Sequence, residues 1–296
     1  MTKNITEIVN SDQSESIEKS VAILGMWYGF NYGAVMTSFA LYRLIKDLGY
    51  NPTLVNHTGH YSIPEMYRDE NTIFRRFIVG KDLKMTPVLS TPKEFEELNE
   101  SYGIFVVGSD QLWRQRYTDK LGMFFFLDFV APRKKRIAFG PSIGTSPCQA
   151  PQSFRDSASL LLSLFTGVSS REREGVAVLE KQYHTKATFV LDPVFLCNKK
   201  HYEECALASK REKPEREFVL SYILDPKREY ASLIQSVAEA ENADSINMLD
   251  INAFEQKKKM LGAPNVVDGL TPDDWVFYIM NCKHLITDSF HGLCFA

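Results

Sequence analysis

The stretch IFVVGSDQ, residues 104–111, places a four-residue apolar run directly before a glycine and three polar side chains. A short apolar run of this kind is typical of a strand that is buried on both faces of a parallel sheet. Upstream, Thr91-Pro92-Lys93-Glu94 supplies an N-cap, a proline at the first helical position and a glutamate at the third, which predicts a helix start. Helix, buried strand and polar strand end, in this order, indicate an α/β fold.

The same alternation continues on both sides of this stretch. A helix is predicted from Ala34 until Gly49, which fits a left-handed C′ position. Residues 57–89 are interpreted as an irregular insertion with one short helix over 73–79. Further strands are predicted over residues 21–26, 53–56, 137–139, 167–169, 189–191, 218–222, 246–249 and 284–287. Two more helices are predicted, over 229–240 and from Thr271, so the pattern favours parallel sheets covered by helices.

The length of 296 residues suggests two domains. A charged, proline-containing stretch over 198–217 is typical of an inter-domain connection. We therefore expect a disordered tail over residues 1–20, a Rossmann-like domain over 21–205, and a second over 206–296, facing each other across a cleft. Because the chain stops at Ala296, within the first turn or so of a predicted helix, we expect the second domain to be incomplete and the chain to be a piece of a longer protein.

Composition excludes several classes of protein. The 34 Lys and Arg against 37 Asp and Glu give a net charge of −3, without the basic excess that nucleic-acid binding needs. No apolar run approaches the roughly 18 residues of a membrane span, and the polar start is unlike a secretion signal. Five cysteines without a C-x-x-C pair argue against a disulfide scaffold or a zinc site. We expect a cytoplasmic protein. The run Arg133-Lys134-Lys135-Arg136 leaves two interpretations open, peripheral association with the inner membrane face or a solvated strand edge.

Ligands bind at the carboxyl ends of strands in open α/β sheets, so polar residues there are the candidates. Asp110, flanked by Ser109 and Gln111, could take a proton from a substrate hydroxyl, or could cap the next helix. Arg171 could grip a phosphate or carboxylate with two parallel hydrogen bonds, or could form a surface pair with a neighbouring glutamate. Asp192 precedes a proline and is interpreted as part of the scaffold.

Two further strand ends carry candidates. Asn31 and Gly33 lie in a glycine-rich loop before a helix, where free N–H groups attract an anion, although a turn can need glycine for its backbone alone. The hexapeptide TDSFHG, residues 287–292, puts His291 between Ser289 and Gly292 where a strand turns into a helix. This hexapeptide is the sharpest functional signal in the sequence.

Five motifs occur in a fixed order: GSDQxW at 108–113, RIAFG at 136–140, VSSRE at 168–172, LDPVFL at 191–196 and TDSFHG at 287–292. Together they resemble the polysaccharide pyruvyl transferase family. The resemblance implies a GT-B-like pair of Rossmann-type domains, phosphoenolpyruvate as donor, and as acceptor the hydroxyls of a cell-surface glycan or its lipid-linked precursor. It also implies a chain that continues beyond Ala296.

The reaction that the resemblance implies needs an acid, a base and an anion site, and we hypothesise a role for each candidate residue. His291 would be the general acid or phosphate partner and Asp110 the base, while Arg171, Asn31 and Ser289 would bind anions. The remaining substrate-binding candidates are Ser109, Gln111, Gly33 and Gly292. No cofactor is expected, and because no D-x-D pair follows a strand, we predict that the reaction needs no metal. Characterised ketal-forming members tend to carry Arg-Leu where this chain has Ser289-Phe290. Two alternatives stay open, a GT-B glycosyltransferase using a nucleotide sugar and a non-catalytic binding protein of a glycan pathway.

Overall fold

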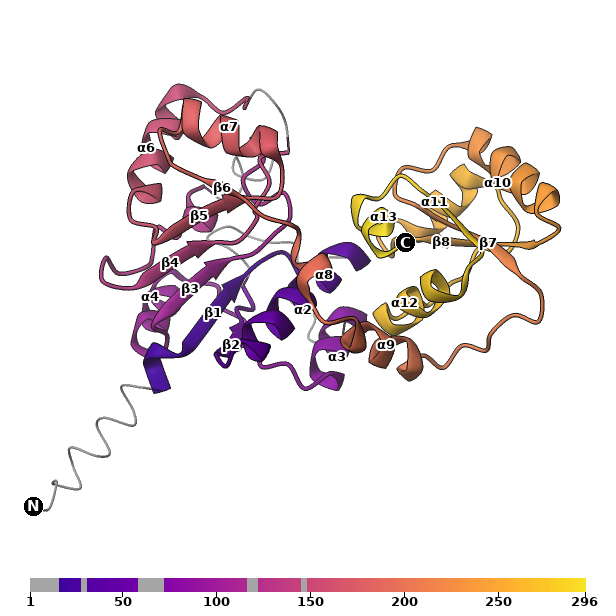
Figure 1. Cartoon of the computed structure of the whole chain (residues 1–296), viewed down its shortest axis with the longest axis horizontal. Coiled ribbons are helices and arrows are strands. Elements are labelled where there is room, and N and C mark those ends of the chain that lie inside the picture. The colour runs from indigo at the N-terminus through magenta and orange to yellow at the C-terminus, as the bar shows by residue number, and fades with distance from the viewer. Residues whose placement is uncertain (1–15, 28–30, 58–71, 116–121, 145–147) are drawn as a thin grey trace, which may run out of the picture. The chain divides into compact units, whose positions relative to one another are not determined.

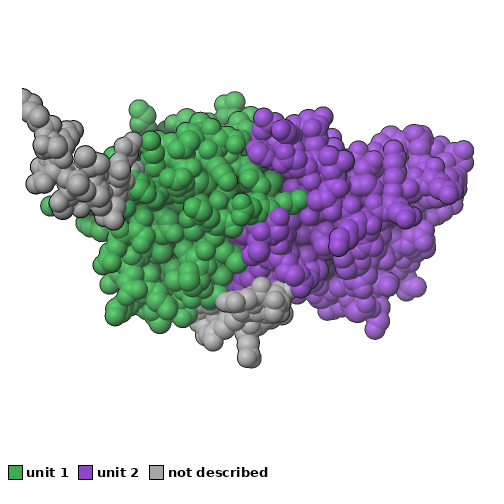
Figure 2. Space-filling model, turned by 90° about the horizontal axis from the view of Figure 1, so that it is seen from below, with its two compact units in different colours: residues 1–26, 38–70, 81–196 green, residues 27–37, 71–80, 197–296 purple. Residues whose placement is uncertain are grey.

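A computed structural model describes residues 16–27, 31–57, 72–115, 122–144 and 148–296. The chain forms two compact units, which Figure 2 colours separately. Unit 1 comprises Met1–Met26, Ser38–Glu70 and Lys81–Leu196, and unit 2 comprises Trp27–Thr37, Asn71–Gly80 and Cys197–Ala296. Most of the expected tail, residues 1–15, lies outside the described ranges, as do Gly29 and Phe30 of the glycine-rich loop and residues 58–71 of the expected insertion.

Unit 1 is built on a six-stranded parallel sheet with the strand order β2-β1-β3-β4-β5-β6 (Figure 1). Its strands are β1 (Ser20–Leu24), β2 (Asn51–Leu54), β3 (Ile104–Val107), β4 (Lys135–Ala138), β5 (Gly167–Ser170) and β6 (Thr188–Phe189). The predicted α/β fold is thereby confirmed. The order reverses between β1 and β3, the kind of position where such sheets bind ligands, and Asp110 follows β3 closely.

Among the described residues, the helices that lie wholly in unit 1 are α4 (Pro92–Ser101), η2 (Phe124–Phe126), α6 (Gln152–Leu162), α7 (Arg173–Gln182) and α8 (Pro193–Leu196). The predicted start of α4 is confirmed as a capping box, because Thr91 Oγ1 accepts the N–H of Glu94 and the Glu94 carboxylate accepts the N–H of Thr91. The core of the unit is rich in buried aromatic rings, and the ring of Phe105 on β3 is fully buried among them. β3 is therefore a fixed support for the residues that follow it.

Unit 2 contains a three-stranded parallel sheet in the order β8-β7-β9. Its strands are β7 (Phe218–Ile223), β8 (Asp244–Leu249) and β9 (His284–Thr287), and its helices are α3 (Ile73–Gly80), α9 (Lys199–Ala208), α10 (Arg228–Ala240), α11 (Phe254–Leu261), α12 (Pro272–Asn281) and α13 (Phe290–Phe295). Thr271 begins α12 with a second capping box. The domain boundary expected between residues 205 and 206 falls inside α9, which belongs to unit 2 as a whole.

Helix α2 (Tyr32–Asp47) is continuous although its residues up to Thr37 group with unit 2 and those from Ser38 with unit 1. It begins two residues before the predicted start at Ala34, because Asn31 Oδ1 accepts the N–H of Ala34 at 3.0 Å and caps the first turn. Gly49 has the expected left-handed backbone, with φ of 85°. Within the described ranges, no helix is both long enough and apolar enough to cross a bilayer.

Candidate functional site

Asp110 combines a strained backbone with a partly exposed carboxylate. Its φ is 97°, a region that non-glycine residues rarely adopt and that costs about 1–3 kcal/mol. Two hydrogen bonds hold this conformation, since its carbonyl accepts the N–H of Leu112 at 2.8 Å and that of Ser142 at 2.7 Å. Its Oδ1 accepts the N–H of the next residue, Gln111, whereas an N-cap bonds two or three residues ahead. The geometry therefore differs from the helix cap that we considered as an alternative.

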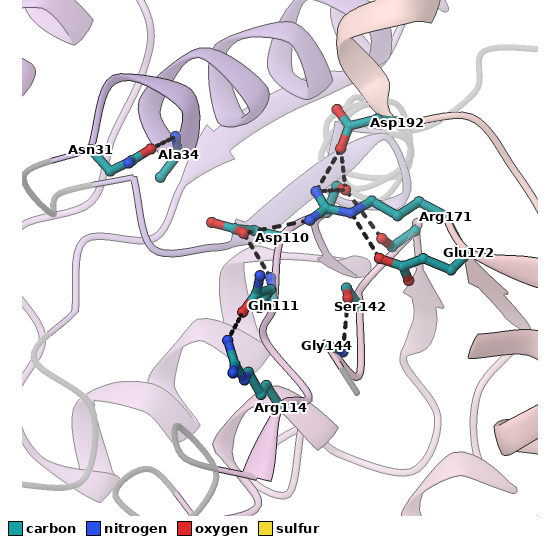
Figure 3. A network of polar contacts seen from close by, with 12 residues as sticks. Asn31, Ala34, Asp110, Gln111, Arg114, Ser142, Gly144, Arg171, Glu172 and Asp192 are labelled. Atoms are coloured by element: carbon teal, nitrogen blue, oxygen red, sulfur yellow. Dashed lines mark hydrogen bonds and ion pairs between the residues drawn. The ribbon is translucent and has the colours of Figure 1, made fainter. Parts of the chain in front are cut away.

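Arg171 extends its guanidinium toward Asp110, as Figure 3 shows. Its side chain is only 4% exposed and meets three carboxylates, with Nη1 at 2.8 Å from Asp192, Nε at 3.3 Å from Glu172 and Nη2 at 3.8 Å from Asp110. Burial acts to lower the pKa of Arg171, but attraction to Asp110 and Asp192 outweighs it and raises that pKa overall. Arg171 is therefore a permanently charged group whose charge is offset by its own chain.

Asp192 fixes the guanidinium from the other side. Its buried carboxylate accepts hydrogen bonds from Ser109 Oγ at 2.7 Å and from the N–H of Val194 at 3.1 Å. Ser109 Oγ also accepts from Arg171 Nη1 at 3.2 Å, so Ser109 is part of the same network. Asp192, which we interpreted from the sequence as scaffold, thus anchors the arginine that faces Asp110. The predicted role of Arg171 in binding a substrate anion stays a prediction.

Gln111 completes this part of the site. Its side-chain Oε1 accepts a hydrogen bond from Arg114 Nη1 at 2.7 Å (Figure 3). The structure thus brings Ser109, Asp110 and Arg171 into one bonded network at the ends of β3 and β5, with Gln111 beside it through its backbone. Substrate binding by Ser109 and Gln111 stays a prediction.

His291 lies in unit 2, in the first turn of α13, and is 6% exposed. Ser289 caps that helix, since its Oγ accepts the N–H of Gly292 at 3.1 Å. The imidazole packs tightly on the first turn of α2, which includes Gly33 although the sequence placed it in the preceding loop, because a Cβ added to Gly33 would lie 2.6 Å from His291 Nδ1. A Cβ at Gly292 would lie equally close, 2.6 Å, to Thr287 Oγ1. Both glycines are thus required by close packing, and Ser289 has a structural role beside its predicted one.

A buried carboxylate that sequence reasoning missed lies in the same unit. Asp250, 7% exposed, follows β8 and accepts hydrogen bonds from Asn31 Nδ2 at 3.0 Å and from the Tyr222 hydroxyl at 2.5 Å. Lys257 Nζ is 4.0 Å away. Burial raises the pKa of Asp250, and the hydrogen bond from Tyr222 and the charge of Lys257 offset only part of this effect. Its position directly after a predicted strand was the signal that would have found it.

The predicted site residues therefore fall into two groups. Unit 1 holds Asp110, Arg171 and their neighbours, and unit 2 holds His291, Ser289, Gly292, Asn31 and Gly33. That the two groups share one cavity stays a prediction. Among the described residues, no three His, Cys, Asp or Glu side chains come close enough together to hold a metal ion. Metal independence also stays a prediction.

Solved structures share the fold at low sequence identity. An alpha-glucosyltransferase (AGT) in complex with UDP superposes with a TM-score of 0.53 at 10% identity, covering 90% of this chain and 72% of that chain. A glycosyltransferase from Rickettsia africae ESF-5 gives 0.50 at 12%, covering 91% and 73%. UDP-GlcNAc 2-epimerase from Neisseria meningitidis, bound to UDP-GlcNAc, gives 0.50 at 10%, covering 91% and 77%. These likenesses confirm the GT-B type of fold with Rossmann-like units, and the fold alone, since transferases and an epimerase share it.

Sequence comparison is more specific. No curated protein matches the chain. A family model described as polysaccharide pyruvyl transferase matches residues 31–296, a range that contains Asn31, Asp110, Arg171 and His291. The match covers most of the chain and confirms the resemblance carried by the ordered motifs. The chain belongs to the polysaccharide pyruvyl transferase family.

Proposed function

We propose that this protein transfers the pyruvyl group of phosphoenolpyruvate to two hydroxyls of one sugar in a cell-surface glycan or its lipid-linked precursor, in the cytoplasm or at the inner membrane face. Membership of the family supports the reaction class. The observation in the structure that carries the proposal is Asp110, a carboxylate on a strained backbone at the end of β3, where parallel sheets bind their ligands.

The reaction needs an acid and a base. A proton is added to the methylene carbon of the enol phosphate, the oxygen of one sugar hydroxyl bonds to the neighbouring carbon, and the hydroxyl proton leaves to a base. The bond from that carbon to the phosphate oxygen then breaks, and phosphate departs. The second hydroxyl bonds to the same carbon and loses its proton, which closes the cyclic ketal. A carboxylate and an imidazole match these proton transfers at neutral pH.

We assign the base to Asp110 and the acid to His291. The carboxylate of Asp110 is 25% exposed, so a hydroxyl can reach it, whereas the nearby Asp192 carboxylate is 1% exposed. The ion pair with Arg171 orients Asp110. With three carboxylates around one guanidinium, this cluster carries net negative charge, which suits proton abstraction more than the grip on a donor anion. Asn31 and Ser289 remain the proposed contacts of the donor.

Replacement of Asp110 tests the assignment. We expect Asp110→Asn to reduce the release of phosphate from phosphoenolpyruvate in the presence of glycan acceptors by about 10²- to 10⁴-fold, the usual contribution of a general base. Asp156→Asn, an exposed aspartate on α6 of the same unit, is the matched control and should leave the rate unchanged. Equal rates for the Asp110 variant and the control would remove Asp110 from the mechanism.

The choice between donors needs a binding measurement, since a nucleotide sugar is the donor in the first alternative. We expect phosphoenolpyruvate to raise the melting temperature, and a panel of nucleotide sugars to leave it unchanged. Stabilisation by nucleotide sugars alone would favour a glycosyltransferase, and stabilisation by neither, together with no phosphate release, would favour a non-catalytic protein. Loss of phosphate release on chelation would contradict the predicted metal independence.

A further inference from the structure

We propose that Asp250 is a positioning residue for His291. Its buried carboxylate holds Asn31 and the start of α2, and the start of α2 in turn supports the imidazole through Gly33. The inference concerns residues of unit 2 only, and its catalytic consequence rests on the proposed role of His291. Neither the family motifs nor the candidate residues chosen from the sequence include Asp250.

The first step is the tie between Asp250 and the loop before α2. Asn31 uses both ends of its side-chain amide, because Oδ1 accepts the N–H of Ala34 at 3.0 Å and Nδ2 donates to Asp250 Oδ2 at 3.0 Å. The backbone of Tyr32 also acts to lower the pKa of Asp250. The aspartate thus occupies the N-terminus of α2, where a negative charge is favoured by the helix dipole and by backbone donors.

The second step is the rigidity of this attachment. The ring of Tyr32 stacks on Trp275, with centroids 6.3 Å apart and planes 7° apart. The Tyr32 hydroxyl donates to the carbonyl of Leu270 at 2.9 Å. Burial raises the pKa of Tyr32, so the hydroxyl keeps the proton that it donates. The Tyr32 ring thus holds one side of the first turn of α2. The hydrogen bond between Asn31 and Asp250 holds the other side, so Asp250 determines the position of this turn.

The third step connects the first turn of α2 to His291. With a Cβ at Gly33 falling 2.6 Å from His291 Cβ and Nδ1, the backbone of Gly33 is in direct contact with the imidazole. Tyr222 forms a second connection between Asp250 and the segment that carries His291. Its hydroxyl donates to Asp250 at 2.5 Å, and its carbonyl accepts from Thr287 Oγ1 at 2.6 Å. Thr287 precedes the turn that carries His291. A shift of Asp250 therefore reaches the imidazole through two routes.

The test compares Asp250→Asn with Asp244→Asn in the full chain. Asp244 is the first residue of β8 and Asp250 follows the last, but Asp244 pairs at the surface with Arg216, so its replacement is a matched control. The measured quantity is the NMR chemical shift of the imidazole Cε1–H group of each histidine. The resonance of His291 is identified by its loss in His291→Gln, and the other five of the six histidines serve as internal references.

We expect Asp250→Asn to shift the His291 resonance while the references stay in place, and to lower kcat/KM for phosphoenolpyruvate by about 10- to 100-fold, as for other misplaced catalytic groups. Asp244→Asn should change neither. An unshifted His291 resonance in a folded Asp250→Asn protein would overturn the positioning role. If all resonances shift together, the carboxylate supports the unit in general, and the proposal is again wrong.

If Asp250→Asn does not fold, a second variant tests the same connection. Asn31→Ser retains a good N-cap for α2 but removes the amide donor to Asp250, so it should shift His291 in the same way and by less. The NMR readout needs no substrate. Absence of phosphate release by the wild-type protein would therefore count against the proposed function, while a selective shift of His291 would still support the positioning role of Asp250.

Discussion

The two units place their polar residues at equivalent positions but stabilise them differently. In unit 1, the buried charge of Arg171 is balanced by the carboxylates of Asp110, Asp192 and Glu172. In unit 2, the buried Asp250 is held mainly by neutral donors, and the cation that pairs with it, Lys257, is 4.0 Å away. The first arrangement fixes a carboxylate by charge, and the second fixes an imidazole by packing and hydrogen bonds. The two clusters should therefore respond to different kinds of substitution.

Charge deletion in unit 1 is expected to have the largest effect. Arg171→Ala leaves Asp192 buried without its cation, which typically costs about 3–5 kcal/mol in the free energy of unfolding. Chemical denaturation measures this change. Combining it with Asp192→Asn should recover part of the loss, because the pair would then be removed together. A loss below about 1 kcal/mol would show that the pair behaves as a surface ion pair does.

Added volume in unit 2 is expected to come next. Gly33→Ala places a methyl group 2.6 Å from His291, and we expect a loss of about 1–3 kcal/mol together with reduced phosphate release. The control is Gly167→Ala in β5, where a Cβ meets nothing within 4 Å. Tryptophan fluorescence can separate the units, since Trp27 and Trp275 belong to unit 2 and Trp113 to unit 1. Equal stabilities of the two variants would contradict the close packing at His291.

The capping boxes allow a like-for-like comparison of the units. Thr271→Ala and Thr91→Ala each remove a hydroxyl acceptor from a helix that begins with the same capping pattern. Each should cost about 1 kcal/mol. The loss should be greater at Thr271, because its hydrogen bond to the N–H of Asp274 is partly buried and Asp274 also accepts from Ser209, whereas the hydrogen bond between Thr91 and Glu94 is exposed. The reverse order in denaturation experiments would contradict this ranking.

The smallest expected effect is on the pH dependence of stability, since the pKa values of two aspartates of unit 2 are shifted in opposite directions. Burial acts to raise the pKa of Asp274, but hydrogen bonds from Ser209 and Thr271 outweigh it and lower that pKa below its ordinary 3.8. Its contribution is present above pH 3.8 and is lost as the pH falls through the folded value. The pKa of Asp250 is raised, so between 3.8 and its folded value the native chain holds the extra proton, and stability falls as the pH rises.

Unfolding measured in Asp274→Asn and Asp250→Asn between about pH 3 and 6 checks these signs. The first variant should lose less stability on acidification than the wild type. The second should lose less stability as the pH rises from 3.8. Parallel curves for all three proteins would show that neither aspartate titrates differently in the folded chain.

Local signals predicted most of the fold. The Thr91 capping box, the helix start at Thr271, the buried run at Ile104–Val107 and the left-handed Gly49 each depend on a few neighbouring residues, and all were confirmed. Helix α11 was missed because FEQKKKML has apolar residues only towards its ends, which gives no helical period. Strand β6 is shorter than the predicted 189–191, and both of its residues are exposed at the edge of the sheet.

The site was less predictable, because it depends on contacts between distant residues. The position of Asp110 after β3 was visible in the sequence, but its positive φ and the ion pair between Arg171 and the buried Asp192 were not. Asp250 was missed although it follows a predicted strand, since an aspartate alone does not reveal a partner as remote in sequence as Asn31. Strand ends thus indicated where to look, and only the fold determined which side chains meet.

The divided membership of α2 has a consequence for limited proteolysis. A single cut after the exposed Lys210, in the irregular segment between α9 and β7, would leave Trp27–Thr37, α3 and α9 on the amino-terminal fragment. All three belong to unit 2, where Tyr32 stacks on Trp275 and both α3 and α9 pack on α12. The two fragments of the nicked protein should therefore elute together from a sizing column and separate only in denaturant.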